Sequence, residues 1–128
     1  MTDELVAMVE REILGWPGVS KETMQGGQGQ GGFLVPPGNV YRIGRKELGH
    51  IHVTGVADLP FTRAIHDQLV AAGRAEAHLA GLTGVVSYHL REEADVPGAI
   101  ELFRLNYDRA RASTARHGAS SARSEDEG

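Results

Sequence analysis

The sequence predicts an α+β domain, in which an antiparallel sheet of about four to six strands carries three helices, mainly on one face. Two observations lead to this prediction. Apolar residues recur at helical spacing in three separate segments, near residues 2–14, 62–72 and 95–112. The segments between them alternate in polarity and are joined by short turns, which favours antiparallel pairing. Helices gathered on one face leave the other face of the sheet to solvent or to a ligand.

Length and composition set the limits of this domain. The chain has 128 residues, a net charge of −4 and no cysteine. We expect one α+β domain over residues 1–112, followed by a disordered polar tail over 113–128, which is rich in Ser, Ala and Arg and ends in "SEDEG". The lack of cysteine excludes disulfides, thiolate nucleophiles and iron–sulfur clusters.

Charge and hydropathy also exclude some partners. A mildly acidic chain is not expected to bind nucleic acid, since such binding depends on neutralising phosphates. No apolar run approaches the ~18 residues of a membrane span, so no membrane is expected as a partner. The beginning of the sequence lacks the basic and apolar regions of a signal peptide, which favours a cytoplasmic protein.

The first helix and the first hairpin are expected near the beginning of the chain. Thr2 is expected to cap the helix, whose buried stripe would include Leu5, Val9 and Ile13. The turn "GWPG" ends it, and an alternating strand follows. The glycine-rich segment 26–32 is expected to be an insertion in a hairpin, because no helix follows it as a phosphate-binding loop would require.

The next two strands contain the most informative pattern, "GHIHVTG". In a strand over Glu47–Val53, simple alternation places Ile51 and Val53 on the core face and His50 and His52 on the open face, together with Leu48. Glu47 falls with the core-facing set. The following "TGVADLPF" is expected to be a loop, in which Asp58 could fold back toward the histidines.

The second half of the chain alternates between helices and strands. A helix is expected over Thr62–Ala72 and ends at Gly73. A short strand or extended link over Arg74–Ala80 and a strand over Val85–Leu90 follow, and Asp95 caps the last helix.

Several motifs occur in an order that resembles a known family. The matching residues are Gly44-Arg45, Glu47 to Gly49, His50, His52, Asp58, Pro60-Phe61, Gly73, His78, Ser87, Leu102 and Tyr107. This order resembles that of the small bacterial and fungal domain labelled luciferase family protein, over roughly residues 40–110. The sequence departs from the family pattern at Val53, where the family has glycine, and at Val85, where it has tryptophan. The glycine-rich segment 26–32 is a further departure.

The family has no established biochemical role, so the resemblance implies a small domain of unknown function. Genuine light emission is not expected. The sequence shows no nucleotide or flavin motif, and it is well short of the ~250 residues of a (β/α)8 barrel. The sequence contains no motif for an organic cofactor. A divalent metal ion is the one cofactor for which it offers candidate ligands.

The two histidines of "GHIHVTG" are the strongest candidates for a site. At positions i and i+2 of a strand they lie ~6.6 Å apart on one face, where both rings can reach one metal ion. His78, Asp58 or Glu47 could be the third ligand, with Glu47 the poorest choice because of its predicted face. Nitrogen and oxygen donors would suit zinc, iron, manganese or nickel.

Two other interpretations of the histidines stay open. In a metal-free site, His50 or His52 would act as an acid or base, with Asp58 orienting one ring. Alternatively, both histidines are structural polar residues of a half-exposed strand. The remaining candidates are interpreted as a strand residue (Ser87), a solvated helix residue (His66), a strand-end residue (His89), a tail residue (His117) and solvated turn cations (Arg42, Arg45).

These interpretations lead to two main hypotheses about function. The first is a ligand-binding or accessory module with a histidine-bearing sheet face, whose partner is an unknown small molecule or protein. The second is a metal-assisted enzyme of hydrolase or oxygenase type that uses His50, His52 and His78, with Asp58 as a further catalytic candidate. A protein-interaction module is a third hypothesis. The sequence predicts no oligomeric state.

Overall fold

The computed structural model of the chain describes residues 1–28, 34–78 and 84–127, with side chains as far as residue 113. Within these residues a six-stranded antiparallel sheet has the order β1-β4-β5-β6-β8-β7. Its strands are β1 (Val19–Met24), β4 (Gly38–Ile43), β5 (Lys46–His52), β6 (Val56–Pro60), β7 (Glu76–Ala77) and β8 (Val85–His89). The predicted α+β class is confirmed.

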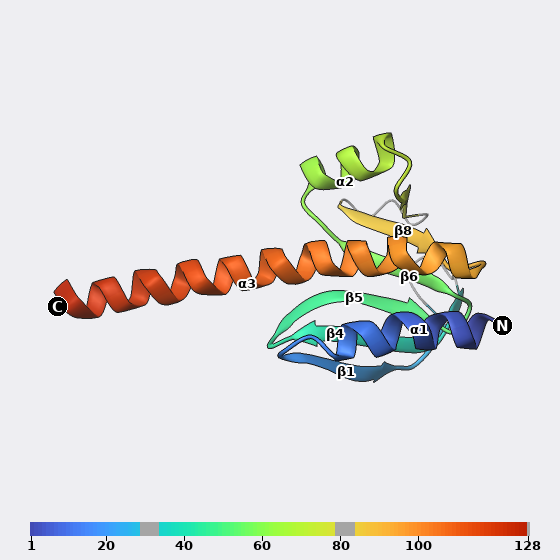
Figure 1. Cartoon of the computed structure of the whole chain (residues 1–128), viewed down its shortest axis with the longest axis horizontal. Coiled ribbons are helices and arrows are strands. Elements are labelled where there is room, and N and C mark those ends of the chain that lie inside the picture. Colours follow the sequence, from blue (N-terminus) through green and yellow to red (C-terminus); the bar gives the residue numbers. More distant parts are fainter. Residues whose placement is uncertain (29–33, 79–83, 128) are drawn as a thin grey trace.

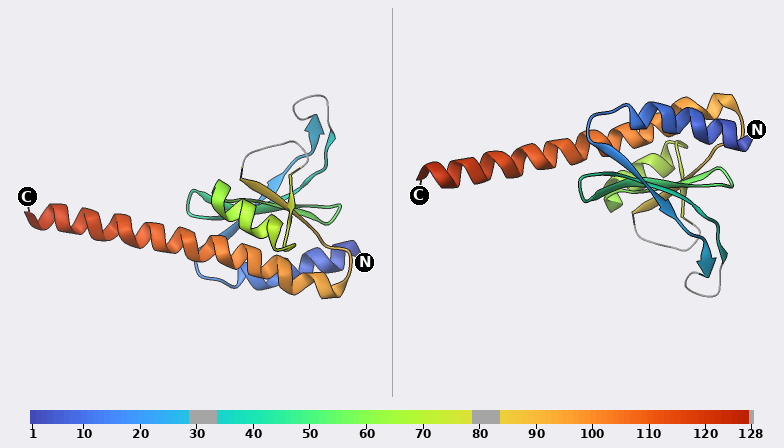
Figure 2. Two further views of the ribbon diagram at one scale, coloured as in Figure 1. Left: turned by 90° about the horizontal axis from the view of Figure 1, so that it is seen from above. Right: turned by 90° about the horizontal axis from the view of Figure 1, so that it is seen from below.

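Three helices accompany the sheet, as predicted: α1 (Thr2–Leu14), α2 (Arg63–Ala71) and α3 (Val96–Glu127), the last preceded by a short 3-10 turn over Glu93–Asp95. Helices α1 and α3 lie side by side against one face of the sheet, and α2 packs beside β7 and β8 (Figures 1 and 2). The sheet face opposite α1 and α3 carries the histidines of β5. Met1, rather than Thr2, is the N-cap of α1. Among the described residues, none of the helices has the length and apolarity needed to cross a membrane.

The core lies between the sheet and the pair α1 and α3. The predicted stripe of α1 is buried, and it belongs to the same core cluster as the fully buried Leu59 of β6 and Phe103 of α3. Burying each such side chain stabilises the fold by about 1.5–3 kcal/mol. This layer fixes which face of the sheet is apolar, so polar groups of the strands gather on the other face.

A β-bulge in β5 changes the expected alternation. The pairing with β4 runs regularly from His52 to Gly49 and then continues at Glu47, so Leu48 is the extra residue. Leu48 is fully buried, whereas Val53 lies beyond the strand and is 53% exposed. The predicted open-face position of Leu48 and core position of Val53 are therefore wrong. The buried position of Ile51 is as expected.

The predicted loop after β5 is also wrong, because residues 56–60 form the strand β6. Asp58 and Pro60 are poor strand formers, which concealed this strand in the sequence. Pro60 is tolerated because it is the last residue of the strand. Asp58 is held directly between β5 and β8, so it reaches the histidines from a neighbouring strand and not from a flexible loop.

Two peripheral segments complete the description. Strands β2 (Gly27–Gln28) and β3 (Leu34–Val35) pair with each other, as an inserted hairpin would, and residues 29–32 of the glycine-rich insertion lie outside the described residues. The helix α3 continues to Glu127, and its second half extends away from the sheet (Figure 1). The disorder that composition predicts for residues 113–128 stays a prediction, as does the domain boundary at residue 112.

Candidate functional site

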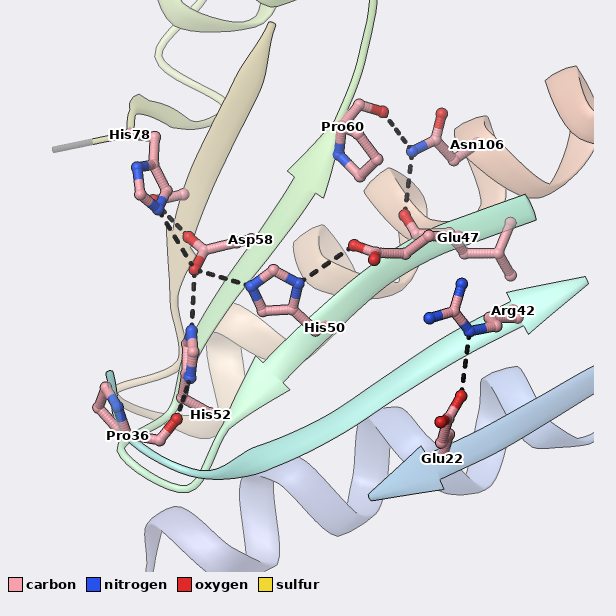
Figure 3. A network of polar contacts seen from close by, with 12 residues as sticks. Glu22, Pro36, Arg42, Glu47, His50, His52, Asp58, Pro60, His78 and Asn106 are labelled. Atoms are coloured by element: carbon pink, nitrogen blue, oxygen red, sulfur yellow. Dashed lines mark hydrogen bonds and ion pairs between the residues drawn. The ribbon is translucent and has the colours of Figure 1, made fainter. Parts of the chain in front are cut away.

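Three adjacent strands place a row of polar side chains on the open face of the sheet. His50 of β5 lies opposite Asp58 of β6, and Asp58 lies opposite Ser87 of β8. Directly opposed residues of antiparallel strands have Cβ atoms about 4.5–5.5 Å apart, so their side chains meet. His52, two residues along β5, joins this row, and His78 reaches it from the end of β7 (Figure 3).

The three imidazoles converge on a single carboxylate oxygen. Oδ2 of Asp58 lies 3.0 Å from Nε2 of His52 and 3.3 Å from Nε2 of His50. Nε2 of His78 is 3.7 Å from the same oxygen. The rings of His50 and His52 are almost perpendicular, with centroids 5.0 Å apart. His50, His52 and Asp58 form a group whose ligand atoms all lie within 4.8 Å of one another. We call these three residues together with His78 the histidine–aspartate cluster.

His50, His52 and Asp58 each have a second polar atom that points away from the centre of the cluster, and each of these atoms has a partner. Nδ1 of His50 lies 3.1 Å from Oε2 of Glu47, and Nδ1 of His52 donates to the carbonyl oxygen of Pro36 at 2.8 Å. The Ser87 hydroxyl donates to Oδ1 of Asp58 at 2.6 Å. These contacts fix the orientation of both rings and of the carboxylate, and they leave the two Nε2 atoms and Oδ2 directed at one another.

The position of Glu47 corrects the sequence-based expectation. Simple alternation predicted this residue on the core face, opposite to the histidines, and this is wrong. Because Leu48 is the extra residue of the bulge, the chain takes three residues from Glu47 to His50 and still returns to the same face. Glu47, which the sequence indicated only as the poorest candidate ligand, contacts His50 instead, and the backbone carbonyl of Pro36 is a site group that the sequence did not indicate. A bulge interrupts the alternation of a strand without a recognisable sequence pattern. A backbone carbonyl is present in every residue, so the sequence cannot indicate which one binds a side chain.

Burial makes the charges of this cluster interdependent. The side chains of Asp58 and His52 are only 4% and 8% exposed, and that of His50 is 24% exposed. Burial alone would lower the pKa of His50, but its hydrogen bonds with Asp58 and Glu47 outweigh this effect and raise the pKa to about 9. Burial likewise opposes ionisation of Asp58, yet contacts with His50, His52 and Ser87 hold its pKa well below its usual range.

The arrangement also imposes a condition on the ring protons. A neutral imidazole carries one N–H, but each ring in this pair has an acceptor oxygen at both nitrogens. If Nδ1 donates outward, Nε2 has either a second proton or a lone pair directed at the carboxylate. The geometry is therefore satisfied by doubly protonated rings or by a cation between the Nε2 atoms and Asp58.

The other candidate residues have partners of their own. His89 pairs with Glu76 at 2.9 Å, and Arg42 pairs with Glu22 at 3.3 Å. His66 lies 2.9 Å from Asp67, and its side chain is only 13% exposed, so the expectation that it is solvated is wrong. Arg45 is exposed at the turn between β4 and β5, as predicted, and the side chain of His117 lies outside the described residues.

Comparison with known proteins agrees with the resemblance noted in the sequence. Residues 45–106 match the family model described as Luciferase domain, a span that includes the whole histidine–aspartate cluster. No curated protein and no solved structure gives a match. The match therefore supports a luciferase-family domain over residues 45–106.

Proposed function

We propose that the histidine–aspartate cluster binds a divalent metal ion, which acts on a small molecule at the open face of the sheet. His50, His52 and Asp58 would be the ligands, and His78 would be a fourth, weaker one. The observation that carries this proposal is the direction of the ligand atoms. The Nε2 atoms of three rings face one carboxylate oxygen, while the outer nitrogens of His50 and His52 already have acceptors.

The spacing of the ligand atoms supports a metal. Zinc binds histidine nitrogen at about 2.0–2.1 Å, so the ligand atoms of a tetrahedral site lie about 3.3–3.4 Å apart. The separations between Asp58 Oδ2 and the three Nε2 atoms are 3.0, 3.3 and 3.7 Å. The distances to Asp58 Oδ2 are therefore close to those of a tetrahedral site, and the ligand atoms of His50, His52 and Asp58 all lie within 4.8 Å of one another.

The second partners support it as well. Metal-binding histidines usually donate their other N–H to a carboxylate or a carbonyl, which fixes the ring and makes it a better ligand. Glu47 provides this contact for His50, and the carbonyl of Pro36 provides it for His52. Ser87 does the same for Asp58 by occupying Oδ1 and leaving Oδ2 available.

The chemistry depends on how many positions the protein fills. His50, His52 and Asp58 would be the three firm ligands, and water or a substrate would displace the weaker His78 from the fourth position, which catalytic zinc sites keep open. A metal there polarises a bound oxygen or lowers the pKa of bound water. This chemistry fits a metal-assisted enzyme of hydrolase or oxygenase type. The proposal rests on these side chains alone and not on the label of the family.

A metal-free acid–base site is the second candidate, and the raised pKa of His50 favours it. In that case His50 would be protonated and would form an ion pair with Asp58. His50 would then be a proton donor toward a ligand on the open face. The two candidates make opposite predictions about metal content.

Metal analysis of protein purified without a histidine tag tests the proposal. We expect one zinc or other divalent ion per chain, and loss of at least about 90% of it in the variant His50→Gln/His52→Gln. His89→Gln is the matched control, since its ring pairs with Glu76 outside the cluster. His78→Ala should weaken binding without abolishing it. Cobalt(II) added to the metal-free protein should give the visible absorption of a tetrahedral site.

One result would overturn the metal proposal. If the folded wild-type protein contains no metal after purification and neither zinc nor cobalt(II) binds it in a titration, the cluster is not a metal site. The metal-free acid–base site would then be the better account of the same side chains.

A further inference from the structure

A cavity separate from the histidine–aspartate cluster opens where β5 begins, β6 ends and α2 starts, beside the middle of α3. We call it the Arg109 cavity. It has a volume of about 410 Å³, and its polar lining residues are Lys46, Glu47, Thr62, Asn106, Arg109 and Ser113. This volume lies in the range of about 300–1,000 Å³ that is typical of sites for small molecules.

The guanidinium of Arg109 is held in place by a chain of hydrogen bonds. The buried amide of Asn106 donates to the carbonyl oxygens of Leu48 at 3.0 Å and Pro60 at 2.7 Å. Its oxygen accepts from Nη1 of Arg109 at 2.6 Å. The guanidinium also lies 5.8 Å from the ring centroid of Phe61. Two strands and a helix thus orient an arginine at the wall of a cavity, using only uncharged partners.

The positive charge around the cavity has few acidic partners. Among the side chains that the structure describes, no carboxylate forms an ion pair with Arg109 or Lys46. The N-terminus of α2 lies at the same cavity through Thr62, and its first turn contains no acidic residue. The one acid of the lining, Glu47, is paired with His50. An anion placed in the cavity would meet two cations and the positive end of a helix.

We infer that the Arg109 cavity binds a small anion, in the form of a carboxylate or phosphate group on an organic molecule. A guanidinium presents a planar set of donors that matches such a group in two parallel hydrogen bonds. Beside these donors, Pro60, Phe61 and Ala110 provide an apolar wall for the rest of the molecule. The inference does not depend on the proposed metal, since none of the donors belongs to the histidine–aspartate cluster.

Calorimetric titration of the protein in EDTA tests this inference without any metal. Benzoate and inorganic phosphate are the two probes, and at least one should bind saturably with a dissociation constant of about 1 mM or tighter. Tighter binding of benzoate would indicate an organic acid, and tighter binding of phosphate would indicate a phosphate ester. Arg109→Gln and Lys46→Gln should each weaken binding about tenfold, which corresponds to about 1.4 kcal/mol.

Arg91→Gln is the matched control, because Arg91 is an exposed arginine that does not line the cavity. It should bind both probes as the wild type does. Lys46 is exposed, so Lys46→Gln is expected to fold normally and to remain informative if Arg109→Gln does not. If neither probe binds, or if Lys46→Gln and a folded Arg109→Gln bind as tightly as the wild type, the inference is wrong.

Discussion

Asp58 is the residue on which the histidine–aspartate cluster depends. Its Oδ1 accepts from Ser87, and its Oδ2 faces His50, His52 and His78. A carboxylate that is 4% exposed is strongly destabilising unless it is paired and hydrogen-bonded. The cluster supplies this compensation either through protonated rings or through a metal ion. A change in the partners of this one oxygen is therefore expected to alter the stability of the protein.

The pKa of His50 predicts how the stability of the metal-free protein varies with pH. This pKa rises from 6.5 to about 9 on folding, so the stabilisation is complete below pH 6.5 and is lost as the pH rises through about 9. The shift corresponds to about 3 kcal/mol. In EDTA, the free energy of unfolding measured in urea should fall between pH 6.5 and 9.5. The lowered pKa of Asp58 adds stability above its unfolded value of 3.8, and this is lost on acidification.

The variant His50→Gln is the control for this pH dependence. Its stability should be nearly constant between pH 6.5 and 9.5, because the titrating ring is absent. A wild-type protein that is equally stable at pH 6.5 and 9.5 in EDTA would contradict the raised pKa. Metal should reverse the trend, since the ligating rings must be deprotonated and metal affinity increases with pH.

At the scale of single elements, β5 is the strand that joins the core to the site. Its bulge directs Leu48 into the core and leaves Glu47 and His50 on the open face. Gly49, which follows Leu48, allows β5 to approach β6 and α3 closely. A Cβ atom at this position would lie 2.9 Å from both Leu59 Cγ and Phe103 Cε1. The strand thus needs glycine where α3 and β6 pack against it.

Gly49→Ala is therefore expected to destabilise the protein by about 1–3 kcal/mol, because the new methyl group overpacks a dense part of the core. Urea unfolding of the variant measures this loss. Gly27→Ala is the control, since a Cβ atom at that position would meet nothing within 4 Å. Its free energy of unfolding should change by no more than about 0.5 kcal/mol. Equal stability of the two variants would show that the close approach at Gly49 is not required.

The elements that the sequence predicted well are those with regular periodicity. The helical spacing of α1 placed Leu5, Val9 and Ile13 in the core correctly. The face of His50 and His52 also followed from simple alternation. Alternation failed at Leu48, because a bulge adds one residue without a compositional signal. It failed at β6 because tertiary packing stabilises a strand that local propensity opposes.

At the scale of the whole molecule, one face of the sheet is structural and the other is polar. Helices α1 and α3 cover the first face, and their packing requires no contribution from the histidine–aspartate cluster (Figure 2). The last buried side chain of α3 among the described ones is Ala110, well before the end of the helix. An isolated helical segment of this length is only marginally stable in water.

Removal of residues 114–128 is therefore expected to leave the free energy of unfolding unchanged within about 0.5 kcal/mol. Hydrogen exchange should show rapid exchange of the amides in this segment in the full chain, and slow exchange of those near Phe103. The chain ending at residue 113 should also keep the same metal content as the full chain. A loss of more than about 1 kcal/mol on truncation would show that the segment packs against the domain or against another molecule.

Because of the bulge at Leu48, one sequence change would harm the protein and still leave the histidine motif unchanged. Deleting Leu48 would leave both histidines and their spacing intact, and a search for His-x-His would still find the motif. The same deletion would restore regular pleating and keep Glu47 on the open face, two residues before His50, but it would remove a fully buried side chain from the core. A diagnostic pattern for this site must therefore include the three-residue interval in Glu-x-x-His-x-His, because in this chain that interval holds a core side chain between two residues of the open face.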